Sequence, residues 1–363
     1  MTTARLYEQA GVSLSAAGVF EDLVKARIEK AWPGGGDEIG GFAGGGLIPR
    51  SARRRVARLA ASTDGAGTKP DIAAVLGRGY YKGVGSDAGA MALVDLYCAG
   101  HQPAFALDYL AVAKLVPEDH IEVIDGVIAA CKAAGCRLIG GETAEHPGMF
   151  RRANGFDIAA FGIGFSAGTI TGAVKAGQCV YGWPSKGPGA NGYSLLRRVF
   201  GLNAGPRTVL RRLAKYWSDL DDTLADALMV PTQMYIDACE AERKLGTVFA
   251  AHAHITGGGL VENIPRILPS TLKVVLNRDA WDRPPILRMA QFVGQIDPDE
   301  MDHVFNQGIQ MVSVVENGEL RCSPRLRPVG ESAIQIGQVV NRRGDEPQVE
   351  FRGTFAGELH TTR

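Results

Sequence analysis

Short clusters of glycine, set directly after apolar segments that are typical of strands, constrain this chain more than any other feature. Glycine makes up 47 of the 363 residues, roughly twice its usual share of ~7%. At the end of a strand, glycine lets backbone N–H groups approach a bound anion because no Cβ stands in the way. Apolar strand-like segments alternate with helical patterns from 59 to 164, and we therefore predict an α+β fold with phosphate-binding turns.

The length of 363 residues suits two domains of ordinary size. A polar, glycine-containing stretch near 166–172 is the expected boundary between them. We predict an N-terminal domain over 1–169, a C-terminal domain over 170–345 and a frayed polar tail over 346–363. The glycine-rich segment 34–46 is interpreted either as a linker or as a loop that covers a ligand.

One helix is predicted most clearly, by proline, acidic residues and apolar spacing together. Pro117 suits the first helical position, Glu118 and Asp119 suit the positive end of the helix dipole, and Gly135 ends the pattern. The other expected helices follow Gly192, begin at Pro231 and cover 260–268. The expected strands cover 59–62, 137–139, 157–163, 179–182 and 248–251.

The charges of the chain balance, with 39 Lys and Arg against 39 Asp and Glu. A general nucleic-acid binder uses an excess of basic residues, so we expect a small-molecule substrate and no nucleic-acid partner. The sequence has no run of 18 apolar residues and no secretion signal, so we expect no membrane partner and a cytoplasmic location. Six scattered cysteines without a CxxC pair suit reduced thiols in the core.

The segment 62–69 carries the strongest chemical signal, because a carboxylate, two glycines and a lysine follow a predicted strand. Glycine admits phosphate oxygens to the backbone, lysine supplies a positive charge, and an aspartate oxygen is a ligand that Mg²⁺ prefers. The pattern is not a Walker loop, and a tight turn with surface charges is the alternative interpretation. The candidate residues for the phosphate and its metal are Asp64, Gly65, Gly67, Thr68 and Lys69.

Three further acidic residues are candidates for the same site. Asp87 and Asp95 are eight residues apart, a spacing that returns to nearly the same helix face, so both carboxylates could line one pocket wall. Glu142 follows a predicted strand, at the edge where α/β sheets present ligand-facing groups. A capping role for the neighbouring Thr143 or Glu145 is the alternative there.

The second half of the chain adds two glycine turns, each placed just before a predicted helix. Backbone N–H groups at such a position attract anions. The candidate residues are Asn191, Gly192, Thr256, Gly257 and Gly258. A phosphate site in one domain and two anion-binding turns in the other suit an enzyme that joins ATP to a second phosphorylated compound.

Five separated motifs, in order along the chain, resemble those of the phosphoribosylformylglycinamidine cyclo-ligases, also called aminoimidazole ribonucleotide synthetases. The likeness extends from about Tyr7 to Gly337. The motifs are Thr63-Asp-Gly-Ala-Gly-Thr-Lys69, Asp95-x4-Gly100-x2-Pro103, Gly140-Gly-Glu-Thr-Ala-Glu-x-Pro-Gly-Met149, Asn191-Gly-Tyr-Ser-Leu195 and Thr256-Gly-Gly-Gly-x-x-Glu-Asn-Ile-Pro-Arg266.

The resemblance implies a fold, an assembly and a reaction. The fold is a two-domain ATP-binding ligase, in which the strands of the N-terminal α+β domain form a barrel shared with a second copy in a homodimer. In the reaction, ATP phosphorylates the formyl amide oxygen of formylglycinamidine ribonucleotide, and the amidine-side nitrogen then closes the imidazole ring. The resemblance also implies ATP and Mg²⁺ as cofactors, with Asp64, Asp87 and Asp95 toward the metal and nucleotide and Glu142 toward the metal or substrate.

Four residues depart from the family pattern within or beside its motifs. Val94, directly before Asp95, stands where the family usually has Asn, and His101 replaces a small residue. Gly189 stands where the family usually has His, and Gln310 replaces a Gly in the segment 306–311, which resembles the family's Asn-x-Gly-x-Gly-Met. These departures leave two alternatives to the cyclo-ligase itself: a paralogue that activates a different amide or amidine, or a nucleotide-binding relative without activity.

Overall fold

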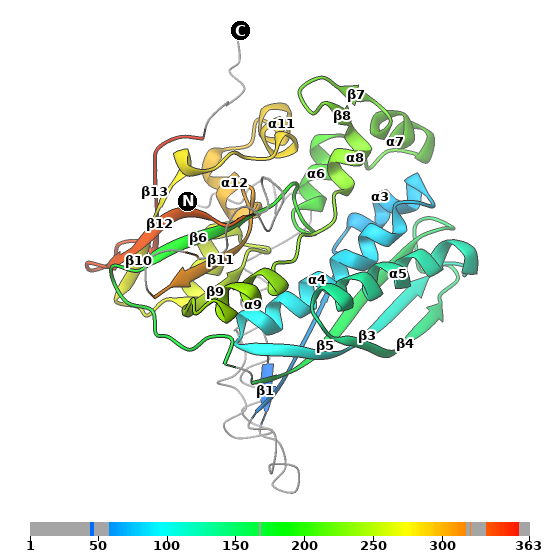
Figure 1. The fold of residues 1–363 in the computed structure, drawn as a ribbon. Coiled ribbons are helices and arrows are strands. Elements are labelled where there is room, and N and C mark those ends of the chain that lie inside the picture. The colour runs from blue at the N-terminus through cyan, green and yellow to red at the C-terminus, as the bar shows by residue number, and fades with distance from the viewer. Residues whose placement is uncertain (1–43, 47–57, 167, 317–319, 321–331, 356–363) are drawn as a thin grey trace, which may run out of the picture.

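The protein consists of two β-sheets with helices packed around them, in a computed structural model that describes residues 44–46, 58–166, 168–316, 320 and 332–355 (Figure 1). The first sheet has the strand order β1-β2-β5-β3-β4 and the second has the order β13-β10-β12-β6-β11-β9. Strands of the first sheet end at Ser166 and those of the second begin at Cys179. No helix in the described part of the chain is long and apolar enough to cross a membrane.

Among the described residues, helices cover the first sheet on one face only, and we call its other face the open face (Figure 1). β3 pairs antiparallel with β5 and parallel with β4, whereas β2 pairs antiparallel with β5. The elements of this half are β1 (Gly44–Gly46), β2 (Leu59–Gly65), α3 (Lys69–Leu76), α4 (Tyr81–Cys98), β3 (His101–Val112), α5 (Pro117–Ala133), β4 (Arg137–Glu145) and β5 (Phe156–Ser166).

The second sheet holds the other half of the chain, with a two-stranded ribbon of its own, β7 with β8. Its first elements are β6 (Cys179–Pro184), α6 (Tyr193–Val199), α7 (Pro206–Leu213), β7 (Tyr216–Trp217), β8 (Asp222–Thr223), α8 (Leu224–Met229), α9 (Ile236–Lys244) and β9 (Phe249–His254). They are followed by α10 (Gly259–Asn263), η2 (Ile264–Ile267), β10 (Leu272–Asn277), η3 (Arg278–Ala280), α11 (Pro285–Gly294), α12 (Pro298–Val304), β11 (Ile309–Val315), β12 (Ile334–Asn341) and β13 (Val349–Arg352).

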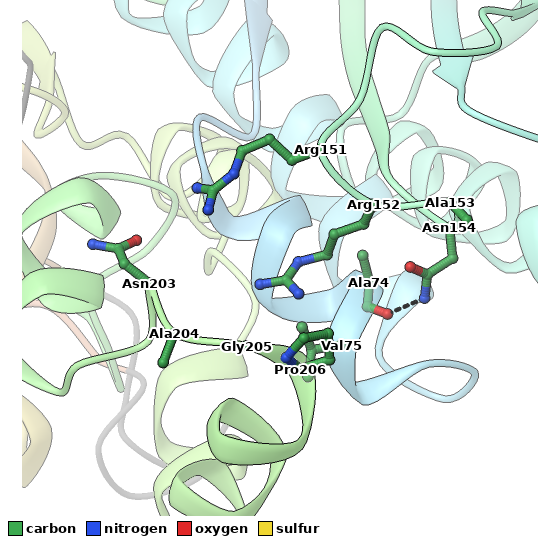
Figure 2. Close-up of a pocket in the computed structure, with 10 residues that line it drawn as sticks. All are labelled: Ala74, Val75, Arg151, Arg152, Ala153, Asn154, Asn203, Ala204, Gly205 and Pro206. Atoms are coloured by element: carbon green, nitrogen blue, oxygen red, sulfur yellow. Dashed lines mark hydrogen bonds between the residues drawn. The ribbon is translucent and has the colours of Figure 1, made fainter.

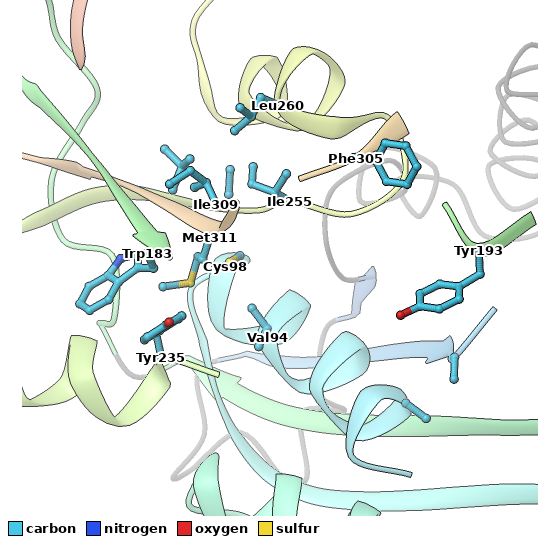
Figure 3. Close-up of a cluster of buried hydrophobic side chains, with 14 of the residues drawn as sticks. Val94, Cys98, Trp183, Tyr193, Tyr235, Ile255, Leu260, Phe305, Ile309 and Met311 are labelled. Atoms are coloured by element: carbon cyan, nitrogen blue, oxygen red, sulfur yellow. The ribbon is translucent and has the colours of Figure 1, made fainter. Parts of the chain in front are cut away.

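Helix α4 joins the two halves into one core. It packs against β2, β3 and β5 of the first sheet and against β9 of the second. Figure 3 shows Val94 and Cys98 of α4 pointing toward Ile309, Met311 and other apolar side chains of the second half. Because one buried cluster runs through both domains, the residues at the junction of the two domains are held in fixed positions.

Several predicted elements are confirmed. The strands over 59–62, 157–163, 179–182 and 248–251 correspond to β2, β5, β6 and β9, and the helix expected at Pro117 is α5. Among the cysteines in the described ranges, Cys98, Cys131, Cys136 and Cys239 are buried free thiols and Cys179 is half-buried. Cys322 and most of the glycine-rich segment 34–46 lie outside the described residues.

Other predictions were wrong, chiefly where glycine or proline was given too much weight. Strand β4 continues through Gly140 and Gly141, because pairing with β3 over its length offsets their low strand preference. The helix expected at Pro231 begins only at Ile236. Gly44–Gly46, assigned to a linker or loop, pair with β2. The tail is not frayed over 349–352, since β13 pairs parallel with β10.

Candidate functional site

The glycine turn after β2 faces the second domain. Gly67 has a φ of 58°, and a Cβ on this residue would lie 3.2 Å from the carbonyl oxygen of Ala190, so glycine is required for the close approach. The hydroxyl oxygen of Thr68 is buried without a hydrogen-bond partner within the described residues. A buried unpaired hydroxyl at the end of a strand has the chemistry to bind a ligand.

Asp64 and Asp95 form the acidic centre of the interdomain junction. The Oδ1 atom of Asp95 lies 2.7 Å from Nδ1 of His254, which is fully buried at the end of β9. Burial and the neighbouring charge of Asp95 raise the pKa of Asp64 to about 6. Burial also raises the pKa of Asp95, against the opposing effect of His254. Two carboxylates held close together against their mutual repulsion provide a site that a divalent cation can stabilise.

Lys69 and Asp87, which the sequence placed in the same site, form a separate and fully enclosed ion pair. The Nζ of Lys69 lies 2.8 Å from Oδ2 of Asp87, and neither side chain is exposed. Nζ also donates to the carbonyl oxygens of Gly189 and Val230, while Thr232 donates twice to Asp87 Oδ1. Both charges are therefore paired within the protein, across the junction of the two domains, and the predicted roles of Lys69 at a phosphate and Asp87 at a metal find no exposed group here.

The two predicted turns of the second domain meet at the same junction. A Cβ on Gly257 would lie 3.9 Å from Oδ1 of Asn191. Gly192 and Gly258 have φ values of 76° and 93° and stand directly before α6 and α10. The structure thus brings together the turns at 65–68, 189–192 and 256–258, although a side chain of Thr256 interacts locally with Asn263.

Glu142 does not join these residues within one chain. In the strand register, Asp64 pairs with Ala160, Ala160 with Asp108, and Asp108 with Gly141. Glu142 is the next residue along β4, so it lies on the opposite, open face of the sheet. Accordingly, the described residues contain no group of three or more His, Cys, Asp or Glu that could hold a metal ion.

Comparisons with known proteins cover most of the chain and both of its halves. The families described as AIR synthase related protein, N-terminal domain and C-terminal domain, match residues 52–166 and 175–350. The phosphoribosylformylglycinamidine cyclo-ligase of Alkaliphilus metalliredigens is 38% identical over 346 residues, which are 92% of this chain and 95% of that protein. The one from Desulfitobacterium hafniense is 37% identical over 343 residues, 92% of this chain and 96% of that protein. The chain belongs to the cyclo-ligase family.

Solved structures with this fold include more distant proteins. Thiamine monophosphate kinase of Aquifex aeolicus has a TM-score of 0.55 at 18% identity, over 95% of this chain and 99% of that one. A chain of the HypE–HypF complex has a TM-score of 0.58 at 19% identity, over 93% and 97%. At these identities the likeness establishes the fold alone.

The departures from the cyclo-ligase motifs have local explanations in the structure. Val94 is buried in the interdomain core and touches apolar side chains rather than a ligand site (Figure 3). His101 is also buried, at the start of β3, and not on the surface as the sequence favoured. Both are packing residues, although Val94 directly precedes Asp95 of the acidic centre.

The departures at Gly189 and Gln310 are neighbours in space. Gln310 is buried, and a Cβ on Gly189 would lie 2.9 Å from its Oε1 atom. The hydroxyl of Ser185 donates to the same oxygen, and Nε2 of Gln310 lies 3.4 Å from Nε2 of His254. Gly189, in place of the family's His, and Gln310, in place of its Gly, therefore lie within one small volume. The comparisons do not favour the alternatives of a paralogue or an inactive relative.

Sequence reasoning missed His254 as a member of the site. Its signal was available, because His254 closely follows the strand predicted over 248–251 and stands two residues before the glycine turn at 256–258. The contact of His254 with Asp95 joins residues 159 positions apart, so spacing along the chain could not reveal it.

Proposed function

We propose that this protein is an ATP-dependent cyclo-ligase that converts formylglycinamidine ribonucleotide to aminoimidazole ribonucleotide with release of ADP and phosphate. The observation that carries the proposal is the meeting of three glycine turns with the Asp64–Asp95 pair at the domain junction. The relatives named as cyclo-ligases, at 37–38% identity, support the same reaction. Such an enzyme of small soluble substrates is expected to work in the cytoplasm.

The chemistry of the reaction explains why these groups are needed. An amide oxygen is a poor leaving group, and its conversion to a phosphate ester splits one difficult step into two easier ones. Phosphoryl transfer depends mainly on positioning and on neutralising charge around the phosphate oxygens. The backbone N–H groups of the turns and the Thr68 hydroxyl provide donors for those oxygens.

The donor set at the junction fits Mg²⁺. The ion takes oxygen ligands, and one or two carboxylates together with phosphate oxygens suffice. Asp64 and Asp95 would hold it. Burial raises the pKa of both acids, and the charge of Asp95 adds to the rise at Asp64, so a bound cation would favour their ionised forms. When bound, Mg²⁺ would neutralise charge on the phosphates of ATP. His254 holds one Asp95 oxygen and so fixes the direction of that carboxylate.

We also propose that the open face of the first sheet binds a second copy of the chain. Alternate residues of β3 and β5 place Phe105, Tyr109 and Phe161 on this face, each more than a third exposed. Aromatic side chains in a row on an uncovered sheet are typical of a subunit interface. Glu142 lies on the same face beside Tyr109, so a homodimer would place it at the interface and give it a route to the partner's site.

The test is to incubate the purified protein with formylglycinamidine ribonucleotide, Mg²⁺ and ATP and to follow ADP and aminoimidazole ribonucleotide together. We expect equal amounts of the two products. ADP release without the imidazole product, or neither product from a protein that binds ATP, would reject the proposed reaction. Light scattering on the same sample measures the mass, and Phe161→Glu should convert a dimer to a monomer.

A further inference from the structure

A basic cleft lies beside the glycine turn at 65–68 and is not explained by the acidic centre. A cavity of about 590 Å³ is lined by α3, by the loop from 151 to 154 and by the segment that leads into α7. A second cavity of about 320 Å³ shares Arg151 and Arg152 with the first and reaches Gly67 and Thr68. The two cavities therefore adjoin at Arg151 and Arg152, and the second ends at the proposed nucleotide site. We refer to the two adjoining cavities together as the cleft.

Three guanidinium groups are gathered in this cleft with one carboxylate between them. Asp71 on α3 forms ion pairs with Arg152, whose Nε lies 3.3 Å from Oδ1, and with Arg197 of α6. Arg151 makes no ion pair or hydrogen bond with any residue in the described ranges. Asp157 also lines the second cavity, so the cleft keeps one positive charge in excess when both acids are ionised.

The arginines of the cleft repel one another. Burial lowers the pKa of the Arg197 guanidinium, and so do the positive charges of Arg151 and Arg152, whereas Asp71 opposes the shift. The side chains of Arg152 and Arg197 are only 11% and 12% exposed, so water screens the repulsion incompletely. An anion bound between the arginines would relieve this repulsion, and the planar guanidinium groups match the oxygens of a phosphate.

The rest of the cleft is suited to the same kind of ligand. Figure 2 shows the side chains of Arg151 and Arg152 extending toward the cavity, with Asn203 across from them. Helix α7 begins at Pro206 in the cavity wall, and its N-cap residue Gly205 provides no side-chain cap. The positive end of the helix dipole therefore adds to the charge of the arginines.

We propose that this cleft binds the phosphate monoester of the second substrate, a sugar phosphate, and directs the rest of that molecule toward the turn at 65–68. The proposal rests on the proposed function for the identity of the reaction but not for the chemistry of the site. A volume of this size accommodates a compound of nucleotide size. Arg151 makes the first contact as the unpaired cation, and Arg152 and Arg197 divide their hydrogen bonds between Asp71 and the ligand.

The experiment is a calorimetric titration of the full-length protein with ribose 5-phosphate, which carries the phosphate monoester alone, and separately with ATP and Mg²⁺. Arg151→Ala should weaken ribose 5-phosphate binding at least about tenfold, as expected for the loss of a charge-assisted contact. ATP binding should change less than about twofold. Arg211→Ala is the matched control, because this arginine is exposed on α7 and lines neither cavity.

A second variant tests the arrangement from the opposite direction. Asp71→Asn removes the carboxylate that competes for Arg152 and Arg197, so ribose 5-phosphate should bind several-fold more tightly than to the unchanged protein. Thermal unfolding of each variant establishes that it is folded. The gain in affinity cannot arise from a damaged fold, whereas a loss could.

The outcomes separate this proposal from the proposed function. If Arg151→Ala weakens ATP and leaves ribose 5-phosphate unchanged, the cleft binds the polyphosphate of the nucleotide and the proposal is rejected. Equal losses in Arg151→Ala and Arg211→Ala would show a general charge effect and would also reject it. If the protein forms no imidazole product but the arginine and Asp71 effects on ribose 5-phosphate appear as expected, the cleft stands and the proposed reaction fails.

Discussion

Asp87 and Asp95 lie eight residues apart on the same helix, α4, and yet their surroundings give them opposite roles. Asp87 faces an enclosed lysine and two donors from Thr232, so every charge in its cluster is compensated. Asp95 contacts His254 and lies near a second acid, Asp64, and Arg266 also acts on it. Burial raises the pKa of Asp87 and of Asp95 alike, so the difference lies in their partners: Asp87 has a lysine in direct contact, and Asp95 has a histidine and a neighbouring acid.

The comparison shows how a structural ion pair differs from a ligand site that uses the same residue types. A buried pair that satisfies all its partners has nothing left to offer a ligand, whereas an uncompensated group is costly unless something binds to it. By this criterion we propose the acids Asp64 and Asp95, and the arginines beside Asp71, as ligand sites. Lys69 and Asp87 instead contribute to the positions of the surrounding turns.

The largest effect is expected from breaking the compensated cluster. Lys69→Met leaves Asp87 buried without its cation, and it should reduce the free energy of unfolding by about 3–5 kcal/mol. Arg78→Ala is the control, because its ion pair with Glu122 has an arginine that is 65% exposed, and it should cost less than about 1 kcal/mol. Denaturant unfolding measures both values.

Nucleotide binding decides what the loss of Lys69 means. At a denaturant concentration low enough for it to remain folded, the Lys69→Met variant should bind Mg²⁺ and ATP nearly as the unchanged protein does. A variant of full stability that no longer binds ATP would instead place Lys69 at the phosphates, as the sequence first suggested. Adding Asp87→Asn should recover part of the lost stability, since the unpaired charge is then removed.

A smaller effect on stability is expected at Gly189, which lies between the Lys69–Asp87 pair and the Asp95–His254 pair. The Gly189 carbonyl accepts from Lys69, and its α-carbon faces Gln310, which approaches His254. Gly189→His places a side chain at a φ of 68° and displaces Gln310, at a cost of about 2–3 kcal/mol. In a protein that also carries Gln310→Gly, the cost should fall by at least about 1 kcal/mol.

The double-mutant cycle, measured by unfolding and by product formation, checks this exchange. The single substitution Gly189→His should lower activity, and the double variant should recover it. Additive effects of the two substitutions would show that Gly189 and Gln310 vary independently. An increase in activity from Gly189→His alone would mean that Gln310 moves aside freely.

The sequence predicted this site only in part, and the reason is physical. Asp64, Gly67 and Asn191 were identifiable because turns, acids and glycines have local signatures. The local sequence could not show which charged residue contacts which other one. Lys69 follows Asp64 by five residues and meets an aspartate eighteen residues on, whereas the partner of Asp95 is His254 in the other domain.

The fold was predicted better than the site for the same reason. Helix α5 and strand β5 follow from their own apolar spacing. Strand β13 and the glycines of β4 needed a neighbouring strand to make them strands, and that information lies far away in the chain. Arg151 carries no sequence signal of its own, because the role proposed for it depends on Asp71 and Arg197 from two other elements.

The smallest expected effect is the pH dependence caused by Asp64 beside Asp95. As the pH rises, the stability of the protein and its binding of ATP with Mg²⁺ should change in opposite directions. With its pKa at about 6 and an ordinary value of 3.8, Asp64 in the folded protein retains a proton that the unfolded chain loses between these values. Without metal, stability should therefore fall as the pH rises from about 4 to 6 and then level off. Mg²⁺ needs the ionised acid, so binding of ATP with Mg²⁺ should increase over the same range.

Asp64→Asn separates these two trends, and Asp108→Asn provides the control. Burial raises the pKa of Asp108 to about 6 as well, but it lies two strands from Asp64, at the centre of β3. At pH 8 in EDTA each variant should be more stable than the unchanged protein by about 2 kcal/mol, allowing for the water that still reaches these side chains. Only Asp64→Asn should abolish metal-dependent ATP binding. Loss of that binding in Asp108→Asn would show that burial of an acid, and not its place at the junction, marks the site, and the contrast between Asp87 and Asp95 would lose its meaning.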